Sequence, residues 1–149
     1  MKKLLILLLF APNFLLAIPL TLSEYIAKNP SWNSSDRPSL SYITLRCGVL
    51  FEQISELYKN NVEEQETYKI APTDAINFFR ASSDIYKTNC INYECIKVEK
   101  KATKEKVKKW ALIYKKELMN NINNNDEMMH GDIKDDFSTC KIKVKPILK

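Results

Sequence analysis

Apolar side chains recur at helical intervals between residues 39 and 59. Five of them, separated by four, three, four and three positions, share one face of a helix: Ile43, Cys47, Leu50, Ile54 and Leu57. A cysteine therefore lies in the middle of the apolar face. Gly48 follows it and costs a helix up to ~1 kcal/mol relative to alanine, so we expect another helix to approach closely at this point.

Three further segments show the same periodicity and predict helices over residues 73–88, 99–121 and 128–143. Their apolar faces comprise Ile76, Phe79, Ser83 and Tyr86 in the first, Thr103, Val107, Trp110, Tyr114 and Leu118 in the second, and Met129, Ile133, Phe137 and Cys140 in the third. Strict alternation of apolar and polar residues, which is typical of β-strands, is weak throughout the chain and gives little support for a sheet. Since amphipathic helices cannot bury their apolar faces singly, we predict a small all-α bundle of about four helices.

The first 17 residues have the layout of a secretory signal peptide. Lys2 and Lys3 precede an unbroken apolar run, Leu4 to Phe10, and Ala17 supplies a small residue for cleavage. The alternative is a retained N-terminal membrane anchor. The apolar span from Leu4 to Leu20 has 17 residues, which is near the lower limit for crossing a bilayer.

The remaining residues are enough for one compact domain and too few for two. We expect an irregular segment over residues 18–38, with a short helix at Leu22–Lys28, and a single helical domain over residues 39–149. Loss of the two N-terminal lysines lowers the formal net charge of +5 to a mildly basic value. Such a charge gives little reason to expect a nucleic-acid partner.

Four cysteines, an even number, indicate disulfides in a chain that enters an oxidising compartment. Cys47 and Cys140 both lie on core-facing helical faces, so we favour a bridge between them that braces the bundle. Cys90 and Cys95 would project about 140° apart on one undistorted helix, so their pairing requires the sequence CINYEC to form a turn. Cross-links between the first predicted helix and the Cys90–Cys95 region are the alternative.

Other cysteine chemistry fits these spacings poorly. Cys90 and Cys95 are too far apart for a zinc knuckle, and they lack the two-residue spacing of thioredoxin-like sites. A cysteine nucleophile paired with His130 would need a third group to orient the imidazole. We therefore interpret the cysteines as structural and expect no cofactor.

The densest group of possible metal ligands lies between residues 126 and 136, and its weak candidates are Asp126, His130 and Asp132. A twelve-residue calcium loop from Asp126 to Phe137 fails as a pattern. Met128 stands at a ligand position, and Phe137 stands where a bidentate glutamate belongs. We interpret the acids as favourable charges near the start of a helix and expect no bound metal.

Lysines crowd the segment 97–121, which is both basic and amphipathic. Candidates for contact with a partner or a membrane surface are Lys101, Lys104, Lys108, Lys109 and Lys115. A basic amphipathic helix binds anionic membrane surfaces or acidic partners. The ordinary interpretation is a solvated lysine face with Trp110 and Tyr114 turned inward.

These patterns favour a small exported helical protein, periplasmic or secreted, that binds another molecule or has a structural role. Its partner would be an envelope protein or an anionic surface. One alternative is an envelope enzyme that uses carboxylates which the spacing does not single out. The other is a protein that associates with a membrane surface through the basic segment 97–121.

Overall fold

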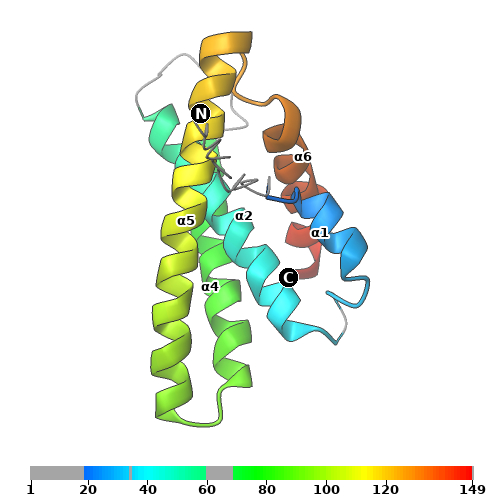
Figure 1. The fold of residues 1–149 in the computed structure, drawn as a ribbon, viewed down its shortest axis with the longest axis vertical. Helices are drawn as coiled ribbons and strands as arrows, with labels where there is room; N and C mark the ends of the chain where they lie inside the picture. The colour runs from blue at the N-terminus through cyan, green and yellow to red at the C-terminus, as the bar shows by residue number, and fades with distance from the viewer. Residues whose placement is uncertain (1–18, 34, 60–68, 149) are drawn as a thin grey trace, which may run out of the picture.

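The computed structural model describes residues 19–33, 35–59 and 69–148, and every regular element within them is helical (Figure 1). The elements are α1 (Leu22–Lys28), α2 (Arg37–Tyr58), α4 (Ala71–Asn89), α5 (Tyr93–Asn125), α6 (Gly131–Thr139), a π-helical turn η1 (Cys140–Val144) and a 3₁₀ turn η2 (Lys145–Leu148). The predicted all-α bundle is confirmed. The predicted signal peptide, residues 1–17, lies outside the described residues.

Helix α2 is the centre of the fold. It packs against α4 and α5, while α1 and α6 lie side by side next to it (Figure 1). Every residue from Ile43 to Phe51 is buried, whichever way its side chain points. The single apolar face predicted for this segment was therefore too narrow, because neighbours surround the middle of α2.

Helix α4 turns a different face to the core from the one predicted. Ile76 is 59% exposed, whereas the buried positions are Ala71, Asp74, Ala75, Phe78 and Ser82. Small side chains on this face let α4 approach α2 closely, although they add little to a hydrophobic pattern. A Cβ at Gly48 would lie 2.9 Å from Cδ1 of Phe79, so the expected close approach at this glycine is present.

At two of the helix starts that differ from the predicted ones, a polar side chain caps the helix. Asp36 accepts the backbone N–H of Ser39 at 3.1 Å, and α2 starts at Arg37 instead of residue 39. Asn92 accepts the backbone N–H of Cys95 at 2.9 Å. Helix α5 consequently starts at Tyr93, six residues before the predicted start. Each cap satisfies an N–H group that the first turn would otherwise leave unpaired.

The segment predicted to be irregular contains the short helix that was expected. A capping box opens α1, since Thr21 and Glu24 each accept a backbone N–H from the other. Trp32 then packs into the core. At the other end of the chain, α6 starts at Gly131, three residues after the predicted start, and η1 continues the helical path to Val144.

Two disulfides join these elements in the pairing that the sequence favoured. Cys47 of α2 is bonded to Cys140 at the start of η1, with Cα atoms 5.6 Å apart. Cys90 and Cys95 are bonded across the α4–α5 connection, with Cα atoms 5.4 Å apart. Cys90 follows the last residue of α4 and Cys95 lies in the first turn of α5, so a break between two helices allows this short bridge.

The two bridges are expected to stabilise the fold unequally. The Cys47–Cys140 bridge spans 93 residues and the Cys90–Cys95 bridge spans five. Because a longer closed loop restricts the unfolded chain more, replacing the first pair by alanine should cost about 4 kcal/mol and replacing the second by serine about 2 kcal/mol. Urea unfolding of the two double variants measures the difference. Equal losses would contradict this account.

Candidate functional site

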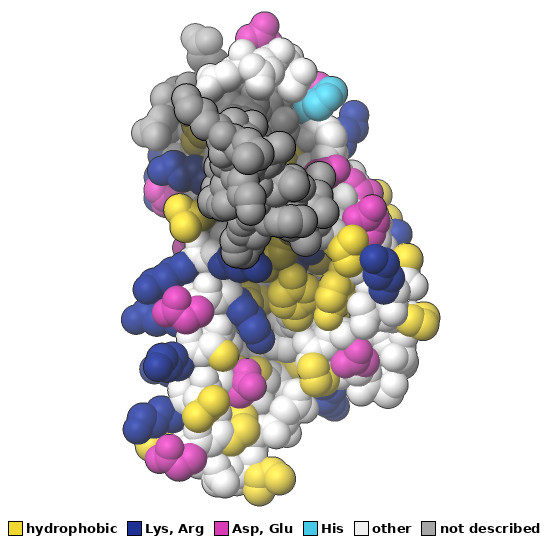
Figure 2. Space-filling model, viewed as in Figure 1, with side chains coloured by type: hydrophobic (Ala, Val, Ile, Leu, Met, Phe, Trp, Pro, Cys, Tyr) yellow, Lys and Arg dark blue, Asp and Glu magenta, His cyan; other side chains and the backbone are white. Residues whose placement is uncertain are grey.

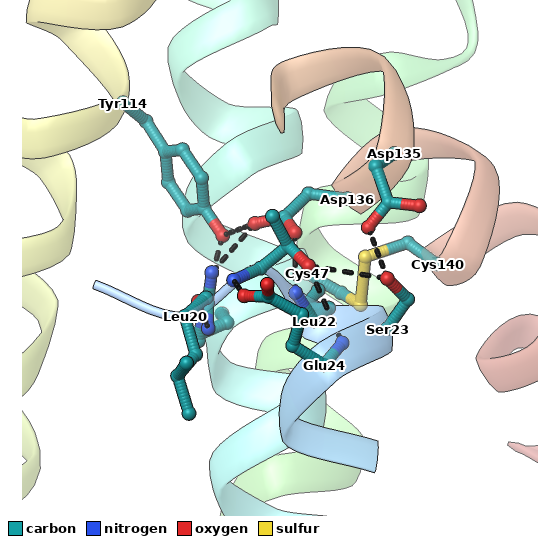
Figure 3. A network of polar contacts seen from close by, with 11 residues as sticks. Leu20, Leu22, Ser23, Glu24, Cys47, Tyr114, Asp135, Asp136 and Cys140 are labelled. Carbon is teal, nitrogen blue, oxygen red and sulfur yellow. Dashed lines mark hydrogen bonds and ion pairs between the residues drawn. A yellow bond between two sulfur atoms is a disulfide. The ribbon is translucent and has the colours of Figure 1, made fainter. Parts of the chain in front are cut away.

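An arginine and an aspartate form an ion pair inside the protein. Arg46 of α2 and Asp136 of α6 have side chains only 2% and 3% exposed, and Nη2 lies 2.6 Å from Oδ2. Tyr114 of α5 completes the cluster, since its hydroxyl donates to Oδ2 of Asp136 at 2.5 Å and accepts from Nε of Arg46 at 3.0 Å. Three helices therefore meet at one buried charge pair (Figure 3).

The same cluster holds the start of the described chain. Nη1 of Arg46 donates to the carbonyl oxygen of Leu20 at 2.8 Å. The backbone N–H of Leu22 donates to Oδ1 of Asp136 at 2.5 Å. Next to it, the hydroxyl of Ser23 donates to Oδ2 of Asp135 at 2.5 Å. The first turn of α1 is thus hydrogen-bonded to α6 directly beside the Cys47–Cys140 disulfide (Figure 3).

Burial and charge act against each other in this cluster. Burial raises the pKa of the Asp136 carboxyl above its usual value, and the Arg46 charge and the donors from Tyr114 and Leu22 oppose that rise. Burial, followed by the Asp136 charge, raises the pKa of Tyr114 well above its usual value. Burial acts to lower the pKa of Arg46, but Tyr114 and Asp136 outweigh it and the net shift is upward. Tyr114 is therefore the neutral hydrogen-bonding member between two charged groups.

An aromatic surface covers the arginine. Cζ of Arg46 lies 3.7 Å from the ring centroid of Trp110, which is a favourable cation–π distance. Beside the cluster lies a cavity of about 260 Å³. Its lining includes Leu20, Trp110 and Tyr114.

The arrangement is suited to holding the fold together. Within the described residues, no buried side-chain nitrogen or oxygen lacks a hydrogen-bond partner. The two buried acids there are Asp74 and Asp136. Oδ1 of Asp74 lies 2.7 Å from Nζ of Lys145, and Asp136 is paired with Arg46. Each buried carboxylate thus has its own cation, which offsets part of the cost of burying its charge.

The sequence prediction missed this ion pair, although the sequence carried a signal for it. Arg46 follows Ile43 by three residues and precedes Leu50 by four, so it shares the buried face of α2. Asp136 stands in the same relation to Ile133 and Cys140. Opposite charges on two apolar faces that a disulfide joins could have been paired in advance.

The three weak metal candidates lie around the connection between α5 and α6. Asp126 ends α5 in the left-handed conformation, His130 precedes α6, and Asp132 lies in the first turn of α6. All three side chains are exposed. Across residues 19–33, 35–59 and 69–148, no three His, Cys, Asp or Glu side chains gather in a way that could hold a metal ion.

The five lysine candidates are all exposed. Most of them belong to a line of residues on α5, called here the lysine stripe, that follows helical spacing: Lys97, Lys101, Lys104, Lys108, Leu112, Lys115 and Met119. Trp110, Tyr114 and Leu118 are buried on another face of the helix, as predicted. Figure 2 shows dark blue side chains following one another along the edge that α5 forms. No helix in the described part of the chain combines the length and hydrophobicity that crossing a membrane requires.

Comparison with known proteins does not assign this chain to a family. No protein-family model, curated protein or solved structure matches the chain.

Removing one charge of the buried pair should be costly. Asp136→Asn leaves Arg46 buried without a counter-charge, which is expected to lower the free energy of unfolding by about 3–5 kcal/mol. Asp135→Asn is the matched control, because among the described residues Asp135 accepts a single hydrogen bond, from the Ser23 hydroxyl at the edge of the cluster. This control variant should lower the free energy of unfolding by less than ~1.5 kcal/mol.

The double variant Arg46→Met, Asp136→Leu buries no charge and should regain part of the stability that Asp136→Asn loses, although Tyr114 and Leu22 lose their acceptor. Urea unfolding of all four proteins measures these differences. If Asp135→Asn and Asp136→Asn lower the free energy of unfolding equally, the buried ion pair does not stabilise the fold more than an ordinary hydrogen bond does.

Proposed function

We propose that this chain is a small exported protein, periplasmic or secreted, that works by binding, and that α5 supplies the contact surface. The observation that carries the proposal is a set of apolar side chains exposed among lysines. Val98 is 65% exposed and Leu112 is 72% exposed, and both lie on α5. Tyr93, at the start of the helix, is 74% exposed. A basic helix that displays apolar side chains among its lysines is typical of surfaces that bind acidic partners or anionic membranes.

The length of α5 supports a contact role. The helix has 33 residues, and in Figure 1 it runs along the whole length of the molecule. Its buried residues, Trp110, Tyr114 and Leu118, belong to its C-terminal half. Packing against the core thus accounts for part of the helix, and the N-terminal half displays mainly exposed side chains.

The disulfides support an extracytoplasmic location. Two bridges are present among the described residues, and disulfides form and persist in oxidising compartments. The signal-peptide pattern of residues 1–17 is the sequence argument for export. Asp136 is paired with the buried Arg46, and Asp74 is paired with the partly exposed Lys145. Each buried carboxylate thus has a structural partner, which favours binding over catalysis.

Site-specific photo-cross-linking tests the proposal. A photoreactive amino acid replaces Leu112 on α5 and, as the control, Ile76 on α4, which is 59% exposed. After irradiation in the natural compartment, position 112 should give covalent adducts of higher mass and position 76 should give none. Absence of adducts at position 112, or equal labelling at both positions, would contradict a contact surface on α5.

A further inference from the structure

The lysine stripe is narrow and straight. Its residues are separated by four, three, four, four, three and four positions, which keeps them within about 80° of one another around a helix of 3.6 residues per turn. At a rise of 1.5 Å per residue, Lys97 and Lys115 stand about 27 Å apart along the axis. The stripe is turned about 120° from the buried face that Trp110, Tyr114 and Leu118 form.

The charge of this segment is strongly one-sided. Between Lys97 and Lys116 the sequence has nine lysines and two acids, Glu99 and Glu105. Oε1 of Glu105 lies 3.6 Å from Nζ of Lys108. Both side chains are largely exposed, so solvent screens the attraction between them. The segment therefore keeps a large positive charge, and an anionic partner would complement it.

Apolar side chains interrupt the line of lysines. Leu112 and Met119 belong to the stripe itself and are 72% and 38% exposed. Val98 and Tyr93 are exposed near its N-terminal end. Lysine side chains reach outward to charged groups while their stems lie along apolar surface. Lysines interleaved with exposed leucine, methionine and tyrosine match the boundary between lipid headgroups and acyl chains.

We propose that the lysine stripe docks α5 lengthwise on the surface of an anionic lipid bilayer. This inference rests on the proposed function and names the partner of the same surface. A single helix edge is convex, and a flat, laterally mobile array of negative headgroups can meet all its lysines at once. Leu112 and Met119 enter the outer acyl region between these contacts, without any part of the chain crossing the bilayer.

Vesicle co-sedimentation tests the proposal with the oxidised protein. Vesicles of phosphatidylglycerol and phosphatidylcholine in equal parts should bind it at low ionic strength, and vesicles of phosphatidylcholine alone should not. The triple variant Lys101→Gln, Lys104→Gln, Lys108→Gln should bind about 100-fold more weakly, because each lysine near an anionic surface contributes about 1 kcal/mol. The variant keeps good helix-forming residues at all three positions.

Matched variants separate the stripe from net charge. Lys28→Gln, Lys134→Gln, Lys143→Gln removes the same charge from three exposed lysines on other elements and should bind nearly as well as the natural protein. Leu112→Gln should weaken binding several-fold and leave its salt dependence unchanged. Equal binding by the two triple variants, or no binding to the anionic vesicles at low salt, would overturn the proposal.

The outcome also distinguishes this proposal from the function on which it rests. Protein adducts at position 112 without binding to anionic vesicles would reject the lipid assignment and leave a binding role for α5. Failure of both the vesicle and the cross-linking experiments would reject both.

Discussion

A guanidinium group taken out of water is the constraint on which the rest of this structure depends. Arg46 lies in the middle of α2, and its burial would be prohibitive without a counter-charge and several acceptors. Asp136, Tyr114 and the carbonyl of Leu20 supply these from three other parts of the chain. The ion pair thereby fixes how α6, α5 and the segment before α1 sit around the central helix. Cys47, the residue after Arg46, forms a disulfide with Cys140 in the turn that follows α6. This bond keeps Arg46 and Asp136 close to each other.

The contacts that attach α5 to the bundle leave one side of this helix exposed. Tyr114 and Trp110 tie the C-terminal half of α5 to the arginine, while the Cys90–Cys95 disulfide ties its first turn to the end of α4. The helix is therefore fixed at its first turn and near its middle, and the lysine stripe lies on the side that faces away from these contacts. A rigid display of charge binds an extended surface with less loss of conformational freedom than a flexible one would.

The fold class and the cysteine pairing could be predicted because both follow from periodicity. Cys47 and Cys140 stand within apolar faces of helical spacing, and a short break separates Cys90 from Cys95. The face of α4 was predicted wrongly, since alanine and serine pack well against α2 but resemble surface residues in a hydrophobic pattern. Arg46 was missed because a charge on an apolar face becomes interpretable only when its partner is known. The lysines were singled out by composition and spacing, but the packing of the bundle is needed to tell which side of α5 is exposed.

Hydrogen exchange at the backbone amide of Leu22 tests the central claim most directly. That N–H donates to the buried carboxylate of Asp136, whereas an amide in the first turn of an unattached short helix would exchange readily. If the buried ion pair ties α1 to the bundle, Leu22 should exchange only through global unfolding, as slowly as the amide of Leu50 in α2. Exchange at Leu22 that is orders of magnitude faster than at Leu50 would show that the cluster does not hold the N-terminal segment, and the account would fail.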